Sequence, residues 1–360
     1  MKTTQLMQTA KALLVPGKGL LAMDESEHTC NMRLAEAGIA QTAAMRRHYR
    51  HLLLTTPGLA EGISGAILHD ETIRQPLLDA KGSKERSAVE FLTRAGIVAG
   101  IKVDLGTRPM AMFPGEVATQ GLDGLDERVS EYAAMGARFA KWRAVITIGP
   151  SQPTDGCIEA NAHQLARYAS ICQEAGLLPI IEPEVVMEGD HDLDRCEEVT
   201  LQVLLAVFLQ LRAQRVLVEA TILKPNMVLP GSEASKIASD EQIARATLRC
   251  LRRAVPAAVA GIAFLSGGQS DIVATQRLNA ICSFASAPWP LTFSFARALQ
   301  HPALRAWAGK PANVRTAQSV LIHRVRCNSE AQRGHYSPCM DSGCTIMTPT
   351  AGTRRTLVRP

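Results

Sequence analysis

Eight short apolar segments, each ending in a polar side chain, recur along the 360-residue chain. They lack the strict alternation of polar and apolar residues, which favours strands buried on both faces. The first seven end at Asp24, His69, Lys102, Lys141, Glu182, Lys224 and Ser266, and the eighth ends near position 295. Helical patterns predict helices at residues 3–14, 29–53, 124–135, 159–175, 194–212, 240–254 and 270–282. Strands that alternate with helices in this way predict a parallel sheet.

Units of one strand and one helix, 29 to 45 residues long, predict a TIM (β/α)₈ barrel with active residues at the carboxyl ends of its strands. A doubly wound open sheet is the alternative. It is disfavoured because no G-x-G-x-x-G turn follows the first strand. We predict one α/β barrel domain over residues 1–336, with an additional helix at its N-terminus. Residues 337–360 are predicted to be a flexible tail.

Composition and charge exclude several classes of function. The formal net charge is +5 and Arg354-Arg355 is only a short basic pair, so no nucleic-acid partner is expected. No apolar run approaches the roughly 18 residues of a membrane span, so no membrane partner is expected either. The nine cysteines are scattered without a C-x-x-C pair, which indicates a reducing, cytoplasmic location. A mildly positive chain suits anionic small molecules.

One strand end carries a candidate nucleophile. Residues 216–225 read as a buried strand that ends on Lys224 and is stopped by Pro225. Burial disfavours the charged form of a lysine, which lowers its pKa and frees the amine to attack a carbonyl. The alternative is a lysine whose ammonium reaches solvent along its aliphatic stem.

The neighbouring strand ends carry charges of both signs. Residues two apart in a strand share a face, so Lys141 and Arg143 point the same way, as do Glu182 and Glu184. The predicted site sets Lys102, Lys141, Arg143 and Lys224 against Asp24, Glu182 and Glu184. An amine, a second cation and carboxylates that move protons are what Schiff-base chemistry on a ketone needs. The alternative is a structural network of salt bridges.

Two further groups of residues are suited to binding phosphate. Ser266, Gly267 and Arg297 follow the last two strands, where TIM barrels commonly bind phosphate. Glycine lets backbone N–H groups approach the oxygens, and an arginine holds them with two hydrogen bonds. Ser26, Thr29 and Arg33, helped by Lys102, follow the first strand and are predicted to bind a second anion.

The motifs AMDES, GIKVD, FAKWR, EPE, ILKPNMVLPG, FLSGGQS and LTFSFARAL resemble those of class I fructose-1,6-bisphosphate aldolase. The resemblance runs from about residue 5 to residue 336. It implies a TIM barrel, usually tetrameric, that uses no metal or other cofactor. It also implies reversible cleavage of fructose 1,6-bisphosphate to dihydroxyacetone phosphate and glyceraldehyde 3-phosphate in glycolysis and gluconeogenesis.

The resemblance also implies roles for individual residues. Lys224 would form the imine, with Lys141 as the neighbouring cation. Glu182 would be the main proton shuttle, with Glu184 beside it, and Asp24 would act on the C4 hydroxyl. Ser266, Gly267 and Arg297 would hold the C1 phosphate, and Ser26, Thr29, Arg33, Lys102 and Arg143 would bind the other phosphate or the hydroxyls.

The sequence departs from the family at Met23, where a small alanine is usual, and at Met32, where lysine is common. The tail also lacks the terminal tyrosine of animal members. Two alternatives follow: a catalytically weak barrel that serves as a binding or scaffold protein, or a lysine aldolase for another phosphorylated ketose. The group Asp190-His191-Asp192 with Cys196 lacks the strict spacing of a metal site. His335, Cys339 and Cys344 offer only three soft ligands, so no metal is expected.

Overall fold

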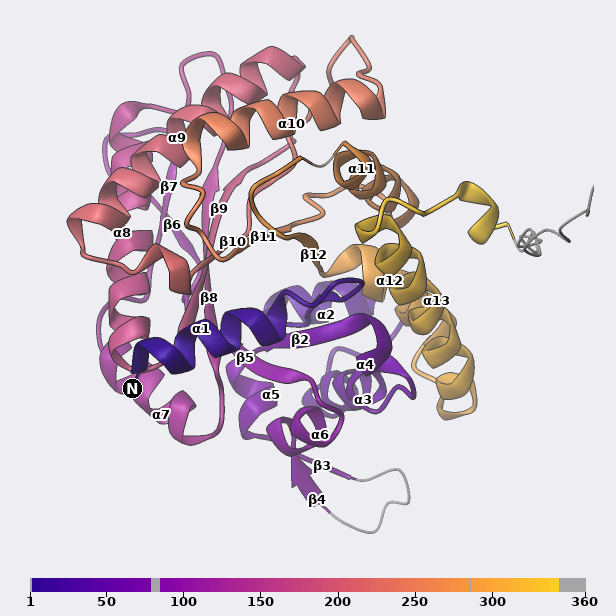
Figure 1. Cartoon of the computed structure of the whole chain (residues 1–360). Coiled ribbons are helices and arrows are strands. Elements are labelled where there is room, and N and C mark those ends of the chain that lie inside the picture. Colours follow the sequence, from indigo (N-terminus) through magenta and orange to yellow (C-terminus); the bar gives the residue numbers. More distant parts are fainter. Residues whose placement is uncertain (1, 79–84, 285, 343–360) are drawn as a thin grey trace, which may run out of the picture.

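The computed structural model describes residues 2–78, 85–284 and 286–342, and in them eight parallel strands close into a barrel (Figure 1). The hydrogen-bonded order around the barrel is β1–β12–β11–β10–β9–β8–β5–β2. The strands are β1 (Gly19–Ala22), β2 (Ile63–Leu68), β5 (Val98–Lys102), β8 (Phe139–Ile146), β9 (Leu178–Val185), β10 (Ile222–Leu223), β11 (Gly261–Phe264) and β12 (Leu291–Phe295). Closure confirms the predicted TIM barrel and excludes the open sheet.

Helices cover the outside of the barrel, and successive helices pack against one another. The longer ones are α2 (Glu27–Glu36), α3 (Ala43–Leu54), α6 (Ala88–Arg94), α7 (Leu125–Ala134), α8 (Asp155–Glu174), α9 (Leu193–Ala213), α10 (Asp240–Ala254), α11 (Asp271–Ser283), α12 (Arg297–Trp307) and α13 (Val314–Gln332). Short helices are α4 (Leu59–Gly62), α5 (Asp70–Arg74) and the 3₁₀ turns η1 (Val218–Ala220), η2 (Pro311–Asn313) and η3 (Pro338–Met340). Two small hairpins pair β3 (Pro76–Leu78) with β4 (Glu85–Ser87) and β6 (Thr107–Pro109) with β7 (Val117–Thr119).

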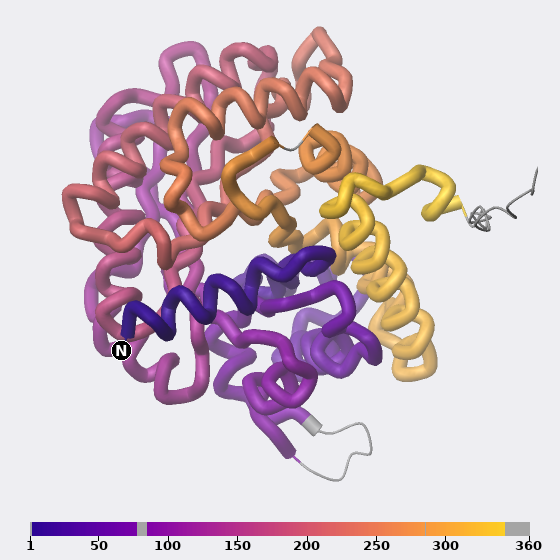
Figure 2. The backbone as a smooth tube through the Cα atoms, in the orientation of Figure 1, coloured from indigo at the N-terminus to yellow at the C-terminus, as the bar shows by residue number. Residues whose placement is uncertain are grey.

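The additional N-terminal helix α1 (Lys2–Leu13) closes one end of the barrel. Its buried residues Leu6, Ala10 and Leu13 belong to the same core cluster as inward-facing strand residues such as Ile222. The hydroxyl of Ser64 donates to the carbonyl of Leu13 at 2.6 Å, which fixes the helix to the start of β2. Figure 2 shows the helix crossing the barrel strands. The amino-terminal end is therefore filled by apolar side chains, and a cavity is left to the carboxyl end.

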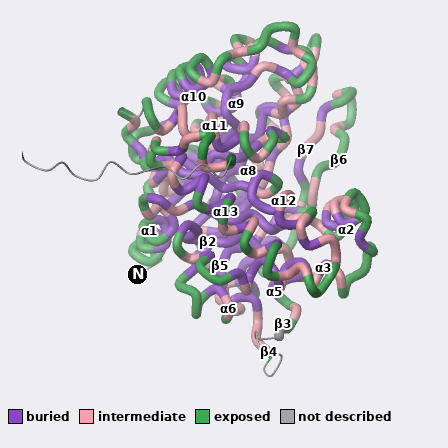
Figure 3. Tube along the Cα trace, turned by 90° about the vertical axis from the view of Figure 1, so that its right-hand side faces the viewer, coloured by how far each residue is buried: buried purple, intermediate pink, exposed green. Residues whose placement is uncertain are grey.

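A second core lies between the strands and the outer helices, and Figure 3 shows the buried segments gathered at the centre of the molecule. Trp142 of β8 stacks on Tyr168 of α8 with ring centroids 5.5 Å apart. The Tyr168 hydroxyl donates toward the carbonyls of Ala140 and Ile180, at 2.8 and 3.0 Å. This aromatic pair ties β8 and β9 to one helix, and these two strands carry four of the predicted site residues.

The predicted helix over residues 29–53 is wrong, because the chain forms two helices there. Gly38, after the end of α2, has a φ of +70°, a left-handed conformation that glycine adopts without strain. The side chain of Thr42 then accepts a hydrogen bond from the N–H of Met45 and starts α3. The sequence of both segments has a helical pattern, so the turn between them is not visible in the pattern.

The predicted strand over residues 216–225 is also wrong in extent. Only Ile222 and Leu223 pair as β10, and η1 precedes them. The side-chain amide of Gln173, on α8, donates to the carbonyls of Leu217 and Ala220 at 2.8 and 3.1 Å. These contacts satisfy backbone groups that a longer strand would have paired with its neighbours.

The chain beyond α13 returns to that helix. Residues 337–342 include η3, and the carboxylate of Asp341 accepts from Arg324 and Tyr336, each at 2.5 Å. The rest of the predicted flexible tail, residues 343–360, lies outside the described residues. Among the described helices, none combines the length and apolar character needed to cross a bilayer.

Candidate active site

A cavity of about 560 Å³ opens at the carboxyl ends of the barrel strands. Its lining includes all thirteen residues that the sequence singled out. They are Asp24, Ser26, Thr29, Arg33, Lys102, Lys141, Arg143, Glu182, Glu184, Lys224, Ser266, Gly267 and Arg297. Parallel strands bring their carboxyl ends to one face of a barrel, and for this reason side chains up to 273 positions apart in sequence share one cavity.

Lys224 extends from the short strand β10 into this cavity. Its backbone N–H donates to the carbonyl of Ile181 at 2.8 Å and so continues the strand pairing. The side chain is only 5% exposed, and its Nζ lies 3.0 Å from Oε1 of Glu182. The ammonium does not extend into bulk solvent, so the alternative of a solvent-reaching lysine does not describe this residue.

Lys141 of β8 lies among three carboxylates. Its Nζ is 2.7 Å from Asp24, 3.3 Å from Glu182 and 3.8 Å from Asp104. Burial acts to lower the pKa of Lys141, but attraction by Asp24, Glu182 and Asp104 outweighs it and raises the pKa. Lys141 is therefore held as a permanent cation beside the candidate nucleophile.

Glu182 joins the two lysines, with Oε1 facing Lys224 and Oε2 facing Lys141. Burial acts to raise its pKa, and the ammonium groups of Lys141 and Lys224 outweigh burial and lower it. The pKa of Asp24 is lowered by the same two lysines against the effect of burial. Both carboxylates are thus ionised and can accept protons from groups held in the cavity.

Arg143 and Glu184 form a separate pair on the same wall. The Nε of Arg143 donates to Oε2 of Glu184, and the carboxylate is 9% exposed. Burial acts to lower the pKa of Arg143, whereas Glu184 raises it. Glu184 therefore pairs with a guanidinium, whereas Glu182 pairs with the two lysines.

One side of the cavity presents backbone N–H groups and an arginine. Gly267 and Gly268 have φ values of +52° and +85°, which allow the turn after β11. A Cβ added at Gly268 would lie 3.4 Å from Nη2 of Arg297, so the glycine lets the guanidinium approach the turn. Arg297 is also the first residue of α12, and no side chain in the described chain caps that helix start. A helix N-terminus beside an arginine favours an anion.

The start of α2 also lines the cavity, after β1, which pairs with β12. The Ser26 hydroxyl accepts from the N–H of Thr29 at 3.2 Å, and the two hydroxyls lie 3.0 Å apart. Arg33, on the next turns of the helix, pairs with Glu25. Lys102 lies 3.3 Å from Asp104. Around the barrel, cationic groups therefore lie on both sides of Lys224, with Arg297 after β12 on one side and Arg143 of β8 and Lys102 of β5 on the other.

Comparison with known proteins decides the family. Residues 5–348 match the profile described as fructose-bisphosphate aldolase class-I. The probable fructose-bisphosphate aldolase class 1 of Xanthomonas axonopodis pv. citri is 49% identical over 337 residues, covering 93% of this chain and 99% of that protein. Cytosolic fructose-bisphosphate aldolase 6 of Arabidopsis thaliana is 49% identical over 333 residues, covering 92% and 91%. The chain belongs to the class I fructose-bisphosphate aldolase family.

A solved structure extends this likeness to three dimensions. The fructose-bisphosphate aldolase of Plasmodium falciparum, solved in complex with TRAP and a small-molecule inhibitor, matches with a TM-score of 0.90 and 44% identity. The match covers 93% of this chain and 96% of that one. This chain is therefore a barrel enzyme, a fructose-bisphosphate aldolase of class I, and neither the scaffold alternative nor another ketose as substrate is favoured by these findings.

Sequence reasoning missed two acidic residues that organise the site of this aldolase. Asp104 contacts Lys102 and Lys141 and accepts from the N–H of Arg143 at 3.3 Å. Glu25 pairs with Arg33 and accepts from the amide of Gln300 at 2.9 Å. Asp104 follows Lys102 by two positions. The rule that residues two apart in a strand share a face therefore could have predicted Asp104 in the site, as it did Arg143 beside Lys141.

Met23 and Met32, where the sequence departs from the family, differ in how far they are buried. Met23 is fully buried in the outer core, and its N–H donates to the carbonyl of Ile67 at 3.0 Å. Met32 is 49% exposed and lines the rim of the cavity near Arg33. Met23 thus affects packing of β1, whereas Met32 adds an uncharged side chain to the rim.

Proposed function

We propose that this aldolase cleaves fructose 1,6-bisphosphate through an imine on Lys224. The observation that carries the proposal is the buried amine of Lys224, 3.0 Å from one oxygen of Glu182, whose other oxygen lies 3.3 Å from Lys141. The nucleophile, its proton acceptor and a fixed positive charge are therefore adjacent. The relatives that are named fructose-bisphosphate aldolases support the choice of substrate.

The first steps form the imine. Lys224 gives a proton to Glu182, and its amine then attacks the C2 carbonyl of the open-chain sugar to form a carbinolamine. Glu182 returns the proton to the departing hydroxyl, which leaves as water. Lys141 remains charged and stabilises the carboxylate and the developing negative charge on oxygen.

The second steps break the C3–C4 bond. Asp24 orients the C4 hydroxyl and accepts its proton, and the bonding electrons move into the protonated imine to form an enamine. The aldehyde product, glyceraldehyde 3-phosphate, then leaves. Protonation of the enamine at C3 and hydrolysis of the imine release dihydroxyacetone phosphate and restore Lys224. The protonated imine is the electron acceptor, so the reaction as proposed draws on no metal or other cofactor.

The two ends of the cavity are proposed to bind the two phosphates. Ser266, Gly267 and Arg297 would hold the C1 phosphate at the start of α12. Ser26, Thr29, Arg33, Lys102 and Arg143 would hold the C6 phosphate and the hydroxyls. Glu184, through its pair with Arg143, would position that guanidinium in addition to standing beside Glu182.

We also infer a single barrel domain over residues 1–336 that assembles as a homotetramer in the cytoplasm and serves glycolysis and gluconeogenesis. The support is the resemblance to the class I family and the cytosolic relatives from Arabidopsis thaliana. Light scattering after size-exclusion chromatography measures the mass of the assembly directly.

Replacing Arg297 with alanine tests the assignment of the C1 phosphate. Losing charge-assisted hydrogen bonds is expected to raise KM for fructose 1,6-bisphosphate about 10- to 100-fold, with a smaller effect on kcat. Fructose 1-phosphate should show the same loss, whereas any slow cleavage of fructose 6-phosphate should be unaffected. A coupled assay of aldehyde formation measures all three substrates.

The matched control is Arg305→Ala, which removes an exposed arginine from the last turn of the same helix. It should leave KM unchanged for every substrate. Equal losses on fructose 6-phosphate and fructose 1-phosphate in Arg297→Ala would contradict the assignment. A wild-type enzyme without cleavage of fructose 1,6-bisphosphate would contradict the proposed function.

A further inference from the structure

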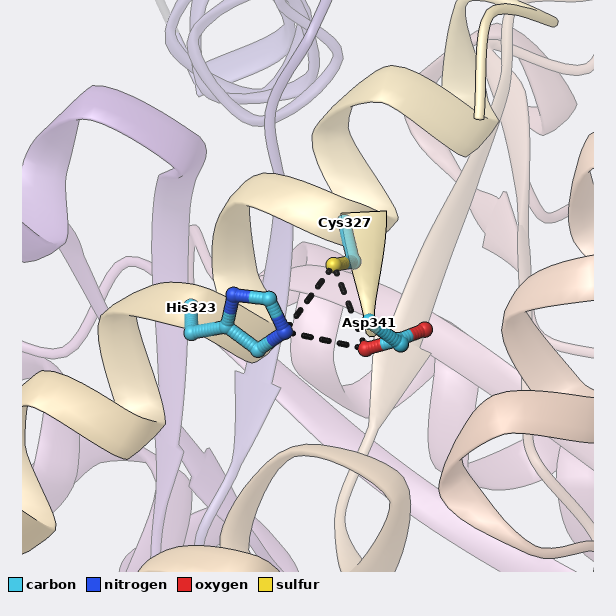
Figure 4. A group of neighbouring side chains, drawn as sticks. All are labelled: His323, Cys327 and Asp341. Atoms are coloured by element: carbon cyan, nitrogen blue, oxygen red, sulfur yellow. Dashed lines mark hydrogen bonds and ion pairs between the residues drawn. The ribbon is translucent and has the colours of Figure 1, made fainter. Parts of the chain in front are cut away.

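Three potential metal ligands meet beside α13, outside the catalytic cavity, with Cys327 buried and His323 exposed. His323 and Cys327 are four residues apart and therefore share one face of the helix. The segment that follows η3 adds Asp341. Figure 4 shows the three side chains pointing toward one another. The atoms Nε2 of His323, Sγ of Cys327 and Oδ1 of Asp341 are 3.6 Å apart in the two pairs that include sulfur and 2.9 Å apart in the third.

These separations fit one tetrahedral metal ion. Zinc lies about 2.0–2.2 Å from nitrogen and oxygen ligands and about 2.3 Å from thiolate sulfur, so tetrahedral ligands stand about 3.3–3.6 Å from one another. Both distances to sulfur already have that value. The distance of 2.9 Å between His323 and Asp341 would have to lengthen by a few tenths of an ångström. We propose that His323, Cys327 and Asp341 bind Zn²⁺ or a similar borderline-soft divalent cation, with water as the fourth ligand.

The carboxylate is held in place for this role. Asp341 accepts from Arg324 and from the Tyr336 hydroxyl, each at 2.5 Å. Arg324 is itself fixed by Thr275 at 2.5 Å, so it does not depend on Asp341 for its position. Tyr336 donates to Oδ2, the oxygen that does not face His323 and Cys327, and such a hydrogen bond orients the carboxylate toward the metal. Arg324 donates to Oδ1, the proposed ligand atom itself. The positive charge of Arg324 opposes a cation, so we expect a site of moderate affinity.

Proton release accompanies binding at this site. The Cys327 thiol donates toward Asp341 at 3.6 Å. A metal binds the thiolate, so it displaces this proton. His323 is 45% exposed, which gives a cation access from solvent.

The proposed ion connects α13 with the segment after it and takes no part in the aldolase reaction. None of the three ligands lines the catalytic cavity. A cation held by both elements would stabilise the return of the chain onto the helix. Zinc is therefore expected to raise Tm of the full-length enzyme without changing its turnover.

Cobalt(II) titration of the metal-free, full-length enzyme tests the site, because cobalt takes zinc positions and gives a thiolate-to-metal absorption band. One equivalent of Co²⁺ should produce this band, and Zn²⁺ should displace it. Cys327→Ser should abolish the band, and His323→Gln should weaken cobalt binding at least about tenfold. Circular dichroism without metal confirms that each variant is folded, and His323, being partly exposed, is the variant least prone to misfold.

Two matched variants control for other ligands near the end of the chain. Cys339→Ser and His335→Gln each remove a ligand type outside the proposed site, and both should retain the band. Absence of the band in the wild type would overturn the proposal. So would a band that persists in Cys327→Ser, or a zinc-dependent rise in Tm that is unchanged in His323→Gln.

Discussion

Lys224→Met is expected to lower kcat/KM for fructose 1,6-bisphosphate by at least about 10⁴-fold, because no other amine replaces the lost nucleophile. The variant should still fold. Glu182 keeps Lys141 at 3.3 Å after the substitution, so its buried charge retains a partner. Methionine also matches the apolar stem of lysine in length. Steady-state kinetics and circular dichroism measure the two expectations.

The matched control for this variant is Lys236→Met, which removes an exposed lysine from the loop before α10. It should have wild-type kinetics. A folded Lys224→Met enzyme that keeps more than a few per cent of wild-type turnover would remove Lys224 from the mechanism. Substrate should still bind to the variant, since the residues at both ends of the cavity are unchanged.

Lys141→Met is expected to lower kcat about 10²- to 10³-fold and to destabilise the fold by about 3 kcal/mol. Its ammonium contacts Asp24 at 2.7 Å and Glu182 at 3.3 Å, and methionine leaves these buried carboxylates without that charge. Kinetics and urea denaturation at about pH 7 measure both effects. Arg138→Met, which removes an exposed arginine immediately before the same strand, should show neither.

Lys141→Met should also change the pH dependence of kcat/KM and of stability, each in a defined direction. In the wild type the lowered pKa values of Asp24 and Glu182 contribute stability above their unfolded pKa values, and this is lost as pH falls through the folded values. Without Lys141, one of the charges that oppose the effect of burial is lost, so both pKa values rise relative to the wild type. The acid limb of kcat/KM should therefore move to higher pH. The stability deficit should narrow as pH falls and the carboxylates protonate. An unshifted acid limb would contradict the role of Lys141.

The sequence predicts the barrel and the cavity well because both depend on strand ends. A polar residue after an apolar strand is visible locally, and closure of the barrel brings Asp24 and Lys224 together without further information. Lys141 faces the same cavity, but it lies inside β8, which continues to Ile146 beyond the predicted strand end. The residues two positions further along, such as Arg143 and Glu184, follow from the alternation of side chains in a strand.

Contacts between distant side chains were not predictable in this way. Glu71 accepts from Arg46 and Arg50, and Arg50 reaches the carbonyl of Glu25 at 2.8 Å. This network supports the wall of the cavity, yet its pairing depends on how α3 packs beside α5. The short β10 likewise depends on Gln173, which is more than 40 residues away. Local patterns carry no information about such partners.

Borohydride reduction with dihydroxyacetone phosphate tests the central claim most directly. Borohydride converts the imine into a stable secondary amine, and peptide mass spectrometry then locates the modified lysine. The proposed mechanism predicts one adduct per chain, on Lys224, and none in Lys224→Met. An adduct on Lys141 or Lys102 in place of Lys224, or a folded and active wild-type enzyme that forms no adduct, would contradict it.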